Sequence, residues 1–253
     1  MYSHEFYLDV FRHFDVGDTP EIFEQCNVGH INTTLMVTCN GQTKYVMQKI
    51  NTSIFKKPVE LIENIINVTE FIKEKVIAEG GDVSREVLRL IPTKSGEYYV
   101  KDSEGSVWRM YYAITGAKTF QTVENPVLFY NSALAFGKFQ RMLSDFPADK
   151  LHETIPNFHN TVSRFADFEE AVRKDIAGRA DSVREDIQFV FDHKYLCPYI
   201  TDRIASGEFP LRVTHNDTKL NNVLIDKTSK KGVCVIDLDT VMPGLASYDF
   251  GDS

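Results

Sequence analysis

The stretch from Val213 to Asp226, VTHNDTKLNNVLID, places a dense group of polar side chains between two short β-prone runs. Such side chains are poor core material, because a buried polar group without a partner costs roughly 1–3 kcal/mol. A plain surface loop would more usually contain Gly, Pro and Ser. The segment therefore predicts a site in which His, Asp, Lys and Asn side chains are held in defined positions.

A second acidic cluster follows further along the chain. It consists of Val235–Asp239, VIDLD, at the end of an apolar run, and it is followed by YDFGD at residues 248–252. The runs VLID and VCVID are predicted to pair as a hairpin through the turn KTSKKG. Such a hairpin would bring Asn222 and Asp237 together, because these residues flank the paired strands.

Together the two clusters hold the groups that phosphoryl transfer from a nucleotide requires. The Asp217 carboxylate could orient or deprotonate an acceptor hydroxyl, and Asn222 and Asp237 offer the oxygen ligands that Mg²⁺ prefers. A plainer interpretation is that His215 is a satisfied core histidine and that the aspartates only cap turns. We favour the first interpretation, because the full set occurs in order.

The composition is that of an ordinary globular protein: of 253 residues, 43% are hydrophobic and 25% are charged. A net charge of -8 and the lack of a broad Lys/Arg face argue against a nucleic-acid partner. Four cysteines without CxxC spacing favour reduced thiols over a metal site or a disulfide framework. There is no signal-peptide pattern and no run long enough to span a bilayer, so we expect a soluble, cytoplasmic protein without a membrane partner. The sequence leaves the oligomeric state open.

The N-terminal part is predicted to form a small antiparallel sheet. Helical periodicity over residues 5–14 is followed by β-prone runs between Ile22 and Ile50, with a hairpin signal at Asn40-Gly41. The segment after Pro58, VELIENIINVTEFIKEKVIAEG, has the pattern of an amphipathic helix. Further β-prone runs are EVLRLIPT, EYYVKD and SVWRMYYAIT. We expect five strands, with one helix inserted after the third.

Beyond Gly116 the pattern becomes mainly helical. Amphipathic runs lie near residues 126–146, 164–178 and 181–193, and another starts near Tyr195. With a boundary near residues 114–120, the predicted fold is α+β and has two lobes: a nucleotide-binding β-lobe over residues 1–115 and a mainly helical catalytic lobe over residues 116–253. The cleft between two such lobes is the default ligand site.

The ordered segments HNDTKLNN, VIDLDT and YDFGD resemble the H-x-D-x-x-x-x-N and I-D motifs of the aminoglycoside phosphotransferase and choline kinase family. The resemblance implies a protein-kinase-like two-lobe fold and, as cofactors, ATP and Mg²⁺. It implies Asp217 as the catalytic base and Asn222 and Asp237 as the Mg²⁺ ligands. His215 would then be a structural loop residue, and Asp249 would brace the catalytic loop.

Within that family, the segments NVGHINTT, YVMQKIN, TFQTVENP and ETIPNFHNT are similar to the N-acetylhexosamine 1-kinases and their bacterial relatives. This similarity implies a small-molecule sugar substrate, N-acetylglucosamine or N-acetylgalactosamine, phosphorylated at its anomeric hydroxyl. Family members continue beyond the point that corresponds to Ser253, with helical chain that adds acceptor-binding residues. We therefore expect the helical lobe to be incomplete at its C-terminus.

The loop GHINTT is predicted to cover the nucleotide phosphates, because it lies between two strands where a kinase has such a loop. We assign Gly29, Asn32 and Thr33 to phosphate binding. A plain hairpin loop would look the same, since the segment lacks a full G-x-G-x-x-G pattern. His30, in the same loop, could instead face the sugar.

The cation that meets the phosphates is predicted to be Lys49, in YVMQKI. A shift of one residue in the strand register would put Gln48 in that position, and the sequence cannot distinguish the two. The helix partner of the cation would be Glu63, or alternatively Glu60. For each glutamate, a solvated charge on the helix is the plainer interpretation.

Two further groups of residues are predicted to contact ligands. The backbone of Ala113 and Ile114, in the segment that joins the two lobes, should lie against adenine. Phe158, His159 and Asn160 offer an aromatic face beside polar groups, which suits a hexose, although the segment could equally be a packed loop.

Two alternative functions stay open. One is a phosphotransferase of the same family that acts on choline, homoserine or an aminoglycoside. Choline would call for an aromatic cage and an aminoglycoside for a strongly acidic pocket, and neither is evident in the sequence. The other alternative is a nucleotide-binding protein without catalysis.

Overall fold

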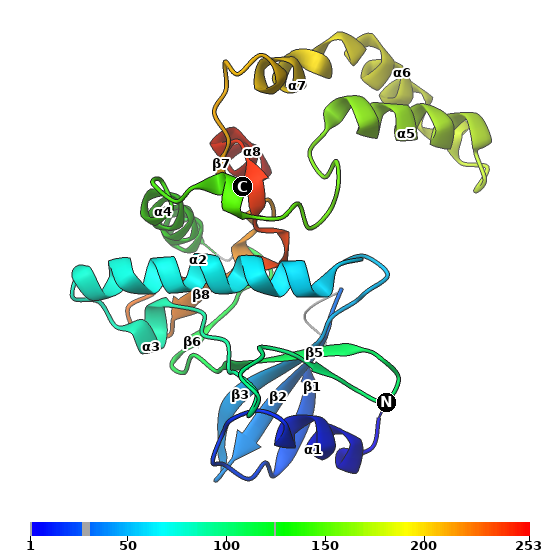
Figure 1. Ribbon diagram of the computed structural model, residues 1–253. Helices are drawn as coiled ribbons and strands as arrows, with labels where there is room; N and C mark the ends of the chain where they lie inside the picture. The colour runs from blue at the N-terminus through cyan, green and yellow to red at the C-terminus, as the bar shows by residue number, and fades with distance from the viewer. Residues whose placement is uncertain (1, 27–30, 124) are drawn as a thin grey trace. The chain divides into compact units, whose positions relative to one another are not determined.

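The structure is a computed structural model that describes residues 2–26, 31–123 and 125–253 (Figure 1). It divides into two compact units. The first unit contains the chain up to Thr154 together with Arg212–Ser253, and the second contains Ile155–Leu211. The loop that carries Asp217 therefore belongs to the same compact unit as the N-terminal sheet.

A five-stranded antiparallel sheet forms the N-terminal part of the first unit. Its strands, in spatial order, are β1 (Ile22–Cys26), β2 (Thr33–Cys39), β3 (Gln42–Lys49), β5 (Val107–Tyr112) and β4 (Val100–Lys101). Asn40 and Gly41 join β2 to β3 with φ angles of 51° and 69°, as a tight hairpin turn with two positive φ angles requires. The hairpin predicted from the Asn-Gly pair is confirmed.

Helix α1 (His4–Arg12) packs on one face of this sheet (Figure 1). Its apolar residues Tyr7, Val10 and Phe11 recur at helical spacing, and all three are buried. They form a core with buried side chains of the strands, among them Trp108. This face of the sheet is filled by apolar packing, so polar ligand-binding side chains are expected on the opposite face.

Helix α2 (Pro58–Ala78) follows β3 and starts with a proline in its first turn, where the missing amide costs nothing. It buries an apolar stripe that includes Leu61. Asn64 on this helix is also buried, and its amide nitrogen donates to the carbonyl oxygens of His152 at 2.7 Å and Val241 at 3.0 Å. These bonds tie α2 to the segment that follows the second acidic cluster.

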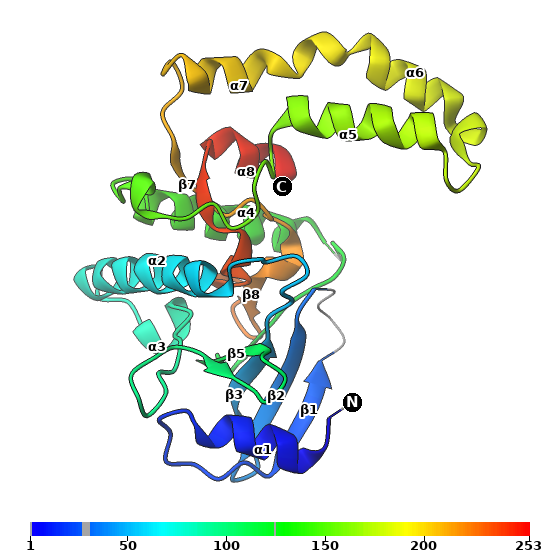
Figure 2. The same cartoon turned by 45° about the vertical axis from the view of Figure 1, so that its right-hand side comes forward.

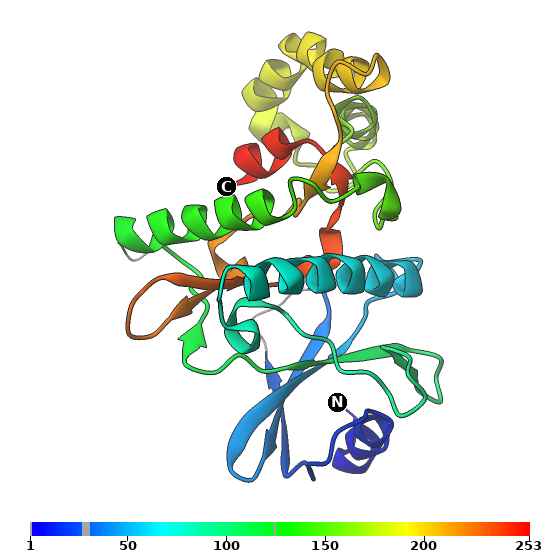
Figure 3. The ribbon, with the colours of Figure 1, turned by 60° about the vertical axis from the view of Figure 1, so that its left-hand side comes forward.

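The part of the first unit that carries the polar loop is built around helix α4 (Pro126–Met142). A three-stranded sheet has the spatial order β6 (Ala117–Lys118), β8 (Val223–Asp226) and β9 (Gly232–Val235). The other elements of this part are β7 (Arg212–Thr214), β10 (Met242–Gly244) and α8 (Ala246–Asp252), and the short helix α3 (Val83–Glu86), which follows α2 in the chain, contacts β9. The β8–β9 hairpin lies along α4 (Figure 3) and pairs Val223 with Val235, which confirms the hairpin predicted from VLID and VCVID.

The second unit is helical and contains α5 (Thr161–Lys174), α6 (Arg184–Asp192) and α7 (Pro198–Ala205). Helix α5 packs against α7 (Figure 2). Phe165 and Phe168 of α5 contact Phe191 of α6, with ring centroids 5.8 and 5.6 Å apart. Of these three rings Phe165 is buried, and the aromatic contacts join α5 to α6.

The predicted fold class is confirmed, because the structure is α+β, has five strands in its N-terminal sheet and places α2 after the third strand. Two details differ. The run EVLRLIPT (86–93) forms only isolated bridges at Leu90 and Thr93, since Pro92 lacks the amide that continued pairing needs. The N-terminal part also contains the short helix α3 in addition to α1 and α2. The lobes 1–115 and 116–253 stay a prediction, while the compact units divide the chain at other positions.

Two further expectations concern the whole chain. The four cysteines, all within the described part of the chain, have free thiols. Across the residues that the structure describes, each helix is too short or too polar to cross a membrane.

The packing of β9 on α4 can be tested with two glycine-to-alanine substitutions, one in β9 and one in α4, that should change stability in opposite directions. A Cβ added at Gly232 would lie 2.7 Å from Ala135 Cβ and 3.0 Å from Asn131 O, both on α4. Gly232→Ala should therefore destabilise the protein by about 1–3 kcal/mol. Gly137→Ala, where an added Cβ meets no described atom within 4 Å, should stabilise α4 by about 0.5–1 kcal/mol. Thermal unfolding measures both changes, and a Gly232→Ala variant as stable as the wild type would contradict the close approach of β9 to α4.

Candidate active site

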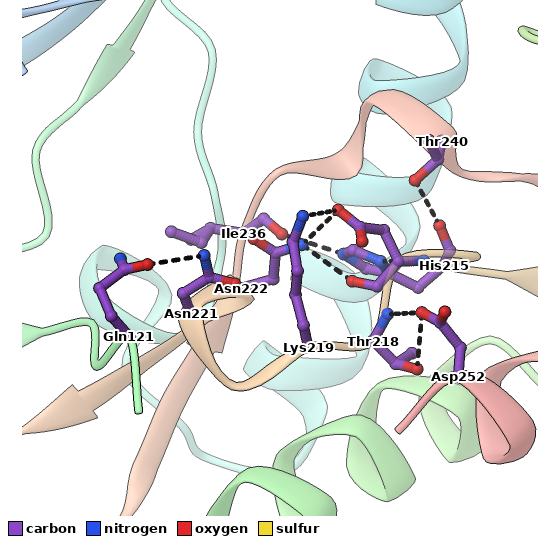
Figure 4. Close-up of polar contacts among 10 residues, drawn as sticks. Gln121, His215, Thr218, Lys219, Asn221, Asn222, Ile236, Thr240 and Asp252 are labelled. Carbon is purple, nitrogen blue, oxygen red and sulfur yellow. Dashed lines mark hydrogen bonds and ion pairs between the residues drawn. The ribbon is translucent and has the colours of Figure 1, made fainter. Parts of the chain in front are cut away.

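A buried carboxylate holds the loop between β7 and β8. Asp249, in α8, accepts the backbone amides of His215 at 2.9 Å and Asn216 at 2.7 Å, one on each oxygen. Hydrogen bonds from two amides stabilise the buried charge. Asp252 of the same helix accepts the amide of Thr218 at 2.7 Å (Figure 4). The predicted bracing of the loop by Asp249 is confirmed.

His215 links this loop to the end of β9. The buried ring lies with Nε2 2.9 Å from the carbonyl oxygen of Ile236, and Nδ1 lies 3.3 Å from the amide of Asp217. Burial lowers the pKa of the imidazole, so the neutral ring donates from Nε2 and accepts at Nδ1. Thr240 Oγ1 donates to the His215 carbonyl at 2.7 Å (Figure 4). His215 is therefore the structural loop residue that the resemblance implied.

Asp217 presents a partly exposed carboxylate that its own loop orients. Its side chain is 28% exposed, and Oδ2 lies 2.8 Å from Lys219 Nζ and accepts Asn222 Nδ2 at 2.9 Å. Asn222 Nδ2 also donates to the Asp217 carbonyl at 2.8 Å. A fixed carboxylate that solvent still reaches can receive an acceptor hydroxyl. The role of Lys219 was missed by the sequence analysis, although its place two residues after Asp217 was a usable signal.

Asn222 and Asp237 converge through the β8–β9 hairpin, as predicted. The amide of Ile236 donates to the Asn222 carbonyl at 2.9 Å (Figure 4), and Asp237 is the next residue. Because Asn222 Nδ2 is bound to Asp217, the side-chain oxygen Oδ1 is the atom left for a cation. The structure thus gathers Asp217, Asn222 and Asp237 around one turn.

The oxygen ligands in this turn fit Mg²⁺. Asp237 is exposed, and none of the described residues forms a hydrogen bond to its carboxylate. Likewise, no group of three or more His, Cys, Asp or Glu side chains that could hold a metal occurs in the described part of the chain. Mg²⁺ in nucleotide sites is commonly held by one or two side chains plus phosphates and water. Asn222 and Asp237 match such a site better than they match an all-protein metal cage.

The environment of Asp237 disfavours its charge. Although the residue reaches solvent, partial desolvation and, to a smaller extent, the nearby negative charge of Asp239 raise the pKa of its carboxyl to about 6. Arg109 acts in the opposite direction. A divalent cation at Asp237 would offset this cost.

A buried ion pair beside Asp237 was missed by the sequence analysis. Arg109 of β5 and Asp239 have side chains 1% and 4% exposed, and Nη2 lies 2.6 Å from Oδ1. Gln48 of β3 accepts hydrogen bonds from Nε and Nη2 of Arg109 at 3.1 and 2.9 Å. No motif marks Arg109, but an arginine inside the apolar run SVWRMYYAIT was a signal that could have found it.

The assignment of Lys49 to the phosphates is corrected by the structure. Lys49 Nζ donates to the Tyr2 hydroxyl at 2.6 Å and lies over the Tyr2 ring, 4.9 Å from its centroid. Neighbouring strand residues point to opposite faces, so Gln48 faces the Arg109 side and Lys49 faces the α1 side. Gln48, the alternative that the sequence left open, therefore lies on the side of the sheet that carries the polar groups.

The predicted ion pair between Lys49 and helix α2 is also corrected. Glu63 lies 2.9 Å from His152 Nε2, and Glu60 lies 2.9 Å from Lys57 Nζ. The partners of these two glutamates are therefore Lys57 and His152, and not Lys49. A buried ion pair on the side of the sheet that Gln48 faces is that of Arg109 with Asp239.

Asn32 is joined to the same ion pair. Its Nδ2 donates to Asp239 Oδ2 at 2.6 Å, and its Oδ1 accepts the amide of Asn51 at 2.9 Å. Both ends of the Asn32 side chain are thus in use, so the structure gives it a different role from the predicted phosphate contact. Thr33 begins β2, and its predicted contact with phosphate stays a prediction.

Four further residues of the N-terminal part were predicted to contact ligands: Ala113 and Ile114 the adenine, Gly29 the phosphates and His30 the sugar. The amide of Ala113 donates to the carbonyl of Lys44 at 2.8 Å, so adenine would have to use the Ala113 carbonyl or the backbone of Ile114. Gly29 and His30 lie outside the described residues. Their assignments stay predictions.

The sugar-binding segment predicted at residues 158–160 belongs to the second unit. Asn160 caps helix α5, with Oδ1 accepting the amide of Ser163 at 3.1 Å. The rings of Phe158 and His159 contact each other at 4.8 Å. These contacts give the segment a local structural role, and its contact with a sugar stays a prediction.

Comparison with known protein families matches residues 23–253 to the phosphotransferase enzyme family. The chain belongs to this family. The match confirms the resemblance drawn from the HNDTKLNN and VIDLDT segments, and with it ATP and Mg²⁺ as cofactors. Phosphotransferases of this family act on hydroxyl groups of small molecules.

Solved structures show the same fold. An aminoglycoside 2′-phosphotransferase of type IIIa, in a GDP complex, is 17% identical, with 98% of this chain and 75% of that chain covered at a TM-score of 0.60. An amicoumacin kinase in complex with AMP-PNP and Ca²⁺ is 11% identical, with 99% and 68% covered and a TM-score of 0.61. A microcompartment-associated aminopropanol kinase is 15% identical, with 99% and 73% covered and a TM-score of 0.52. The predicted kinase-like fold is therefore confirmed.

The raised pKa of Asp237 gives a prediction for stability without metal. A folded-state pKa above the ordinary 3.8 means that this group loses stability for the fold as pH rises from about 4 through about 6. In EDTA at pH 8, Asp237→Asn should therefore raise Tm by roughly 1–3 °C, since solvent screening leaves only part of the effect. The gain should disappear near pH 4.

Asp226→Asn is the matched control with the opposite sign. Hydrogen bonds from Ser229 and Arg85 hold the pKa of Asp226 well below its usual range, so its removal should lower Tm at pH 8. A Tm at pH 8 that falls in Asp237→Asn as it does in Asp226→Asn would show that the Asp237 carboxylate is instead stabilised by a cationic partner.

Proposed function

We propose that this phosphotransferase transfers the γ-phosphoryl group of ATP to the anomeric hydroxyl of an N-acetylhexosamine. The observation that carries the phosphotransfer role is the arrangement around Asp217. Its carboxylate is oriented by Lys219 at 2.8 Å and Asn222 at 2.9 Å, beside the turn that carries Asp237. The proposed base Asp217, the candidate metal ligands Asn222 and Asp237 and the cationic Lys219 thus lie on one short loop and the hairpin that follows it.

The residues of the site have distinct roles in this proposal. Asp217 receives the hydrogen bond of the acceptor hydroxyl and directs its oxygen toward the phosphorus atom, which is a matter of orientation as much as of basicity. Lys219 is bound to Asp217 through an exposed side chain, and its ammonium group offsets negative charge on the transferring phosphoryl group. Asn222 Oδ1 and the Asp237 carboxylate would hold Mg²⁺, which supplies further charge neutralisation at the phosphates.

The sugar as acceptor is supported by the resemblance of NVGHINTT, YVMQKIN, TFQTVENP and ETIPNFHNT to N-acetylhexosamine 1-kinases. The solved relatives include kinases whose names give an aminoglycoside, amicoumacin and aminopropanol as acceptors. These acceptors differ widely, so the fold itself does not select one. His30, Phe158, His159 and Asn160 are the residues that we propose for contact with the sugar.

Asp217→Asn tests the role of the carboxylate. The substitution keeps size and shape, so Mg²⁺-dependent ATP binding should be nearly retained. Loss of the acceptor-orienting charge should reduce turnover by about 10²–10⁴-fold. Equilibrium nucleotide binding and steady-state turnover are measured on the same preparation.

Asp226→Asn serves as the control for Asp217→Asn, because Asp226 lies at the far end of β8 from the loop. It should turn over ATP at the wild-type rate. Equal turnover by wild type and Asp217→Asn would exclude Asp217 as the base. Nucleotide binding without any turnover in the wild type would favour a non-catalytic protein.

A panel of acceptors tests the sugar. The purified protein is supplied with ATP, Mg²⁺ and, separately, N-acetylglucosamine, N-acetylgalactosamine, choline, homoserine and an aminoglycoside. We expect phosphate on carbon one of an N-acetylhexosamine, located by NMR of the product. Phosphate that appears only on choline, homoserine or the aminoglycoside would refute the sugar assignment and leave the phosphotransferase assignment intact.

A further inference from the structure

The buried ion pair between Arg109 and Asp239 joins the N-terminal sheet to the turn that carries Asp237. Arg109 lies on β5, and Gln48 on β3 fixes the guanidinium by accepting from both Nε and Nη2. Asp239 lies in the short 3-10 helix Leu238–Thr240, which begins directly after Asp237. One side-chain contact therefore connects two strands of the sheet with the proposed metal-binding turn.

The Asp239 carboxylate is buried beside a cation of the protein itself, so it is not open to a metal ion. Oδ1 forms an ion pair with Arg109 Nη2 at 2.6 Å without a hydrogen bond, and Oδ2 accepts a hydrogen bond from Asn32 Nδ2 at 2.6 Å. Its carbonyl oxygen accepts Thr154 Oγ1 at 3.0 Å. Asp237, two residues earlier, is exposed and forms no hydrogen bond with the described residues. The two carboxylates of this turn thus differ in function: one anchors the turn, and the other is available to a ligand.

The anchored turn holds Asp237 in an uncommon backbone conformation. Its φ of 60° and ψ of 55° lie in the left-handed region, which costs a residue with a Cβ about 1–2 kcal/mol. Such a conformation persists only where surrounding contacts determine it, and it is often found at functional sites. Here Arg109 and Asn32 contact the Asp239 carboxylate, and the next residue, Thr240, donates from Oγ1 to the His215 carbonyl at 2.7 Å.

The net stability of the ion pair does not explain its burial. Taking two charges out of water costs about as much as their attraction returns, so buried pairs are weak contributors to folding free energy. The guanidinium fork, in contrast, fixes the direction of a carboxylate more narrowly than an ammonium group does. Arg109 Nη1 and Asp239 Oδ1 are also buried without hydrogen-bond partners among the described residues, so the pair is not optimised for stability alone.

We propose that Arg109 is a positioning residue for the metal-binding turn: through Asp239 it fixes Asp237 for binding of the Mg²⁺–nucleotide complex. This inference rests on the proposed function, because it assigns a role within the same site. It also gives the sheet a different connection to the site from the lysine–glutamate pair that the sequence predicted.

The experiment measures how Mg²⁺ strengthens binding of a fluorescent ATP analogue. The test variant is the pair Arg109→Met and Asp239→Asn in one chain, since removal of both partners leaves no unpaired buried charge. Its control is the pair Arg85→Met and Asp226→Asn, which removes an Arg–Asp ion pair of 2.7 Å outside the site. Arg109→Lys is made as well, because it keeps the charge and changes only the geometry.

We expect the test variant to fold and to need about tenfold more Mg²⁺ for half-maximal binding, since residues that orient a metal ligand typically contribute that much. Arg109→Lys should lie between it and the wild type, and the control should match the wild type. The inference would be overturned if the test variant needed the same Mg²⁺ concentration for half-maximal binding as the wild type. It would also be overturned if the control variant needed as much additional Mg²⁺ as the test variant. If the test variant fails to fold, a wild-type midpoint in Arg109→Lys would overturn the inference, and a raised midpoint would support it. Absence of Mg²⁺-dependent nucleotide binding in the wild type would instead refute the proposed function, and the inference with it.

Discussion

The placement of Asp217 depends on one buried carboxylate, that of Asp249. The Asp249 carboxylate accepts hydrogen bonds from the backbone amides of His215 and Asn216, and these bonds fix the path of the loop after β7. Asp217, the next residue, lies where the loop is partly exposed to solvent. His215 then connects the loop to Ile236 through its ring. The site is thus built from backbone groups and buried polar side chains, and the residues that would meet substrate are held indirectly. Such satisfied polar networks define one geometry more narrowly than apolar packing does.

A second set of contacts fixes the other half of the site. Arg109 of β5 and Asn32, directly before β2, contact Asp239 and so determine the turn at Asp237. The left-handed backbone at Asp237 is strained, and its carboxylate has a raised pKa. The strained backbone and a carboxylate charge that Arg109 offsets only in part both lower the stability of the fold without ligand. Binding of a divalent cation at Asp237 would offset the charge. This combination is typical of a binding site and unusual for a structural turn.

The sequence predicted the parts of the site that lie close together along the chain. Asp217 and Asn222 share one loop, and Asp237 joins them through a hairpin whose strands were recognisable from their apolar pattern. Contacts between distant segments could not be predicted in this way. The side to which Lys49 points depends on strand register, where a shift of one residue exchanges the two faces. The partner of Arg109 is Asp239, which lies far along the chain. This contact depends on the tertiary structure, and no spacing of residues in the sequence predicts it.

The most direct test of the central claim is a crystal structure of the protein with Mn²⁺ and a non-hydrolysable ATP analogue, with the ion located by anomalous scattering. We expect one ion bound by Asn222 Oδ1 and the Asp237 carboxylate at about 2.0–2.2 Å, with phosphate oxygens completing its coordination. An ion bound elsewhere, with these two side chains directed away from it, would contradict the account.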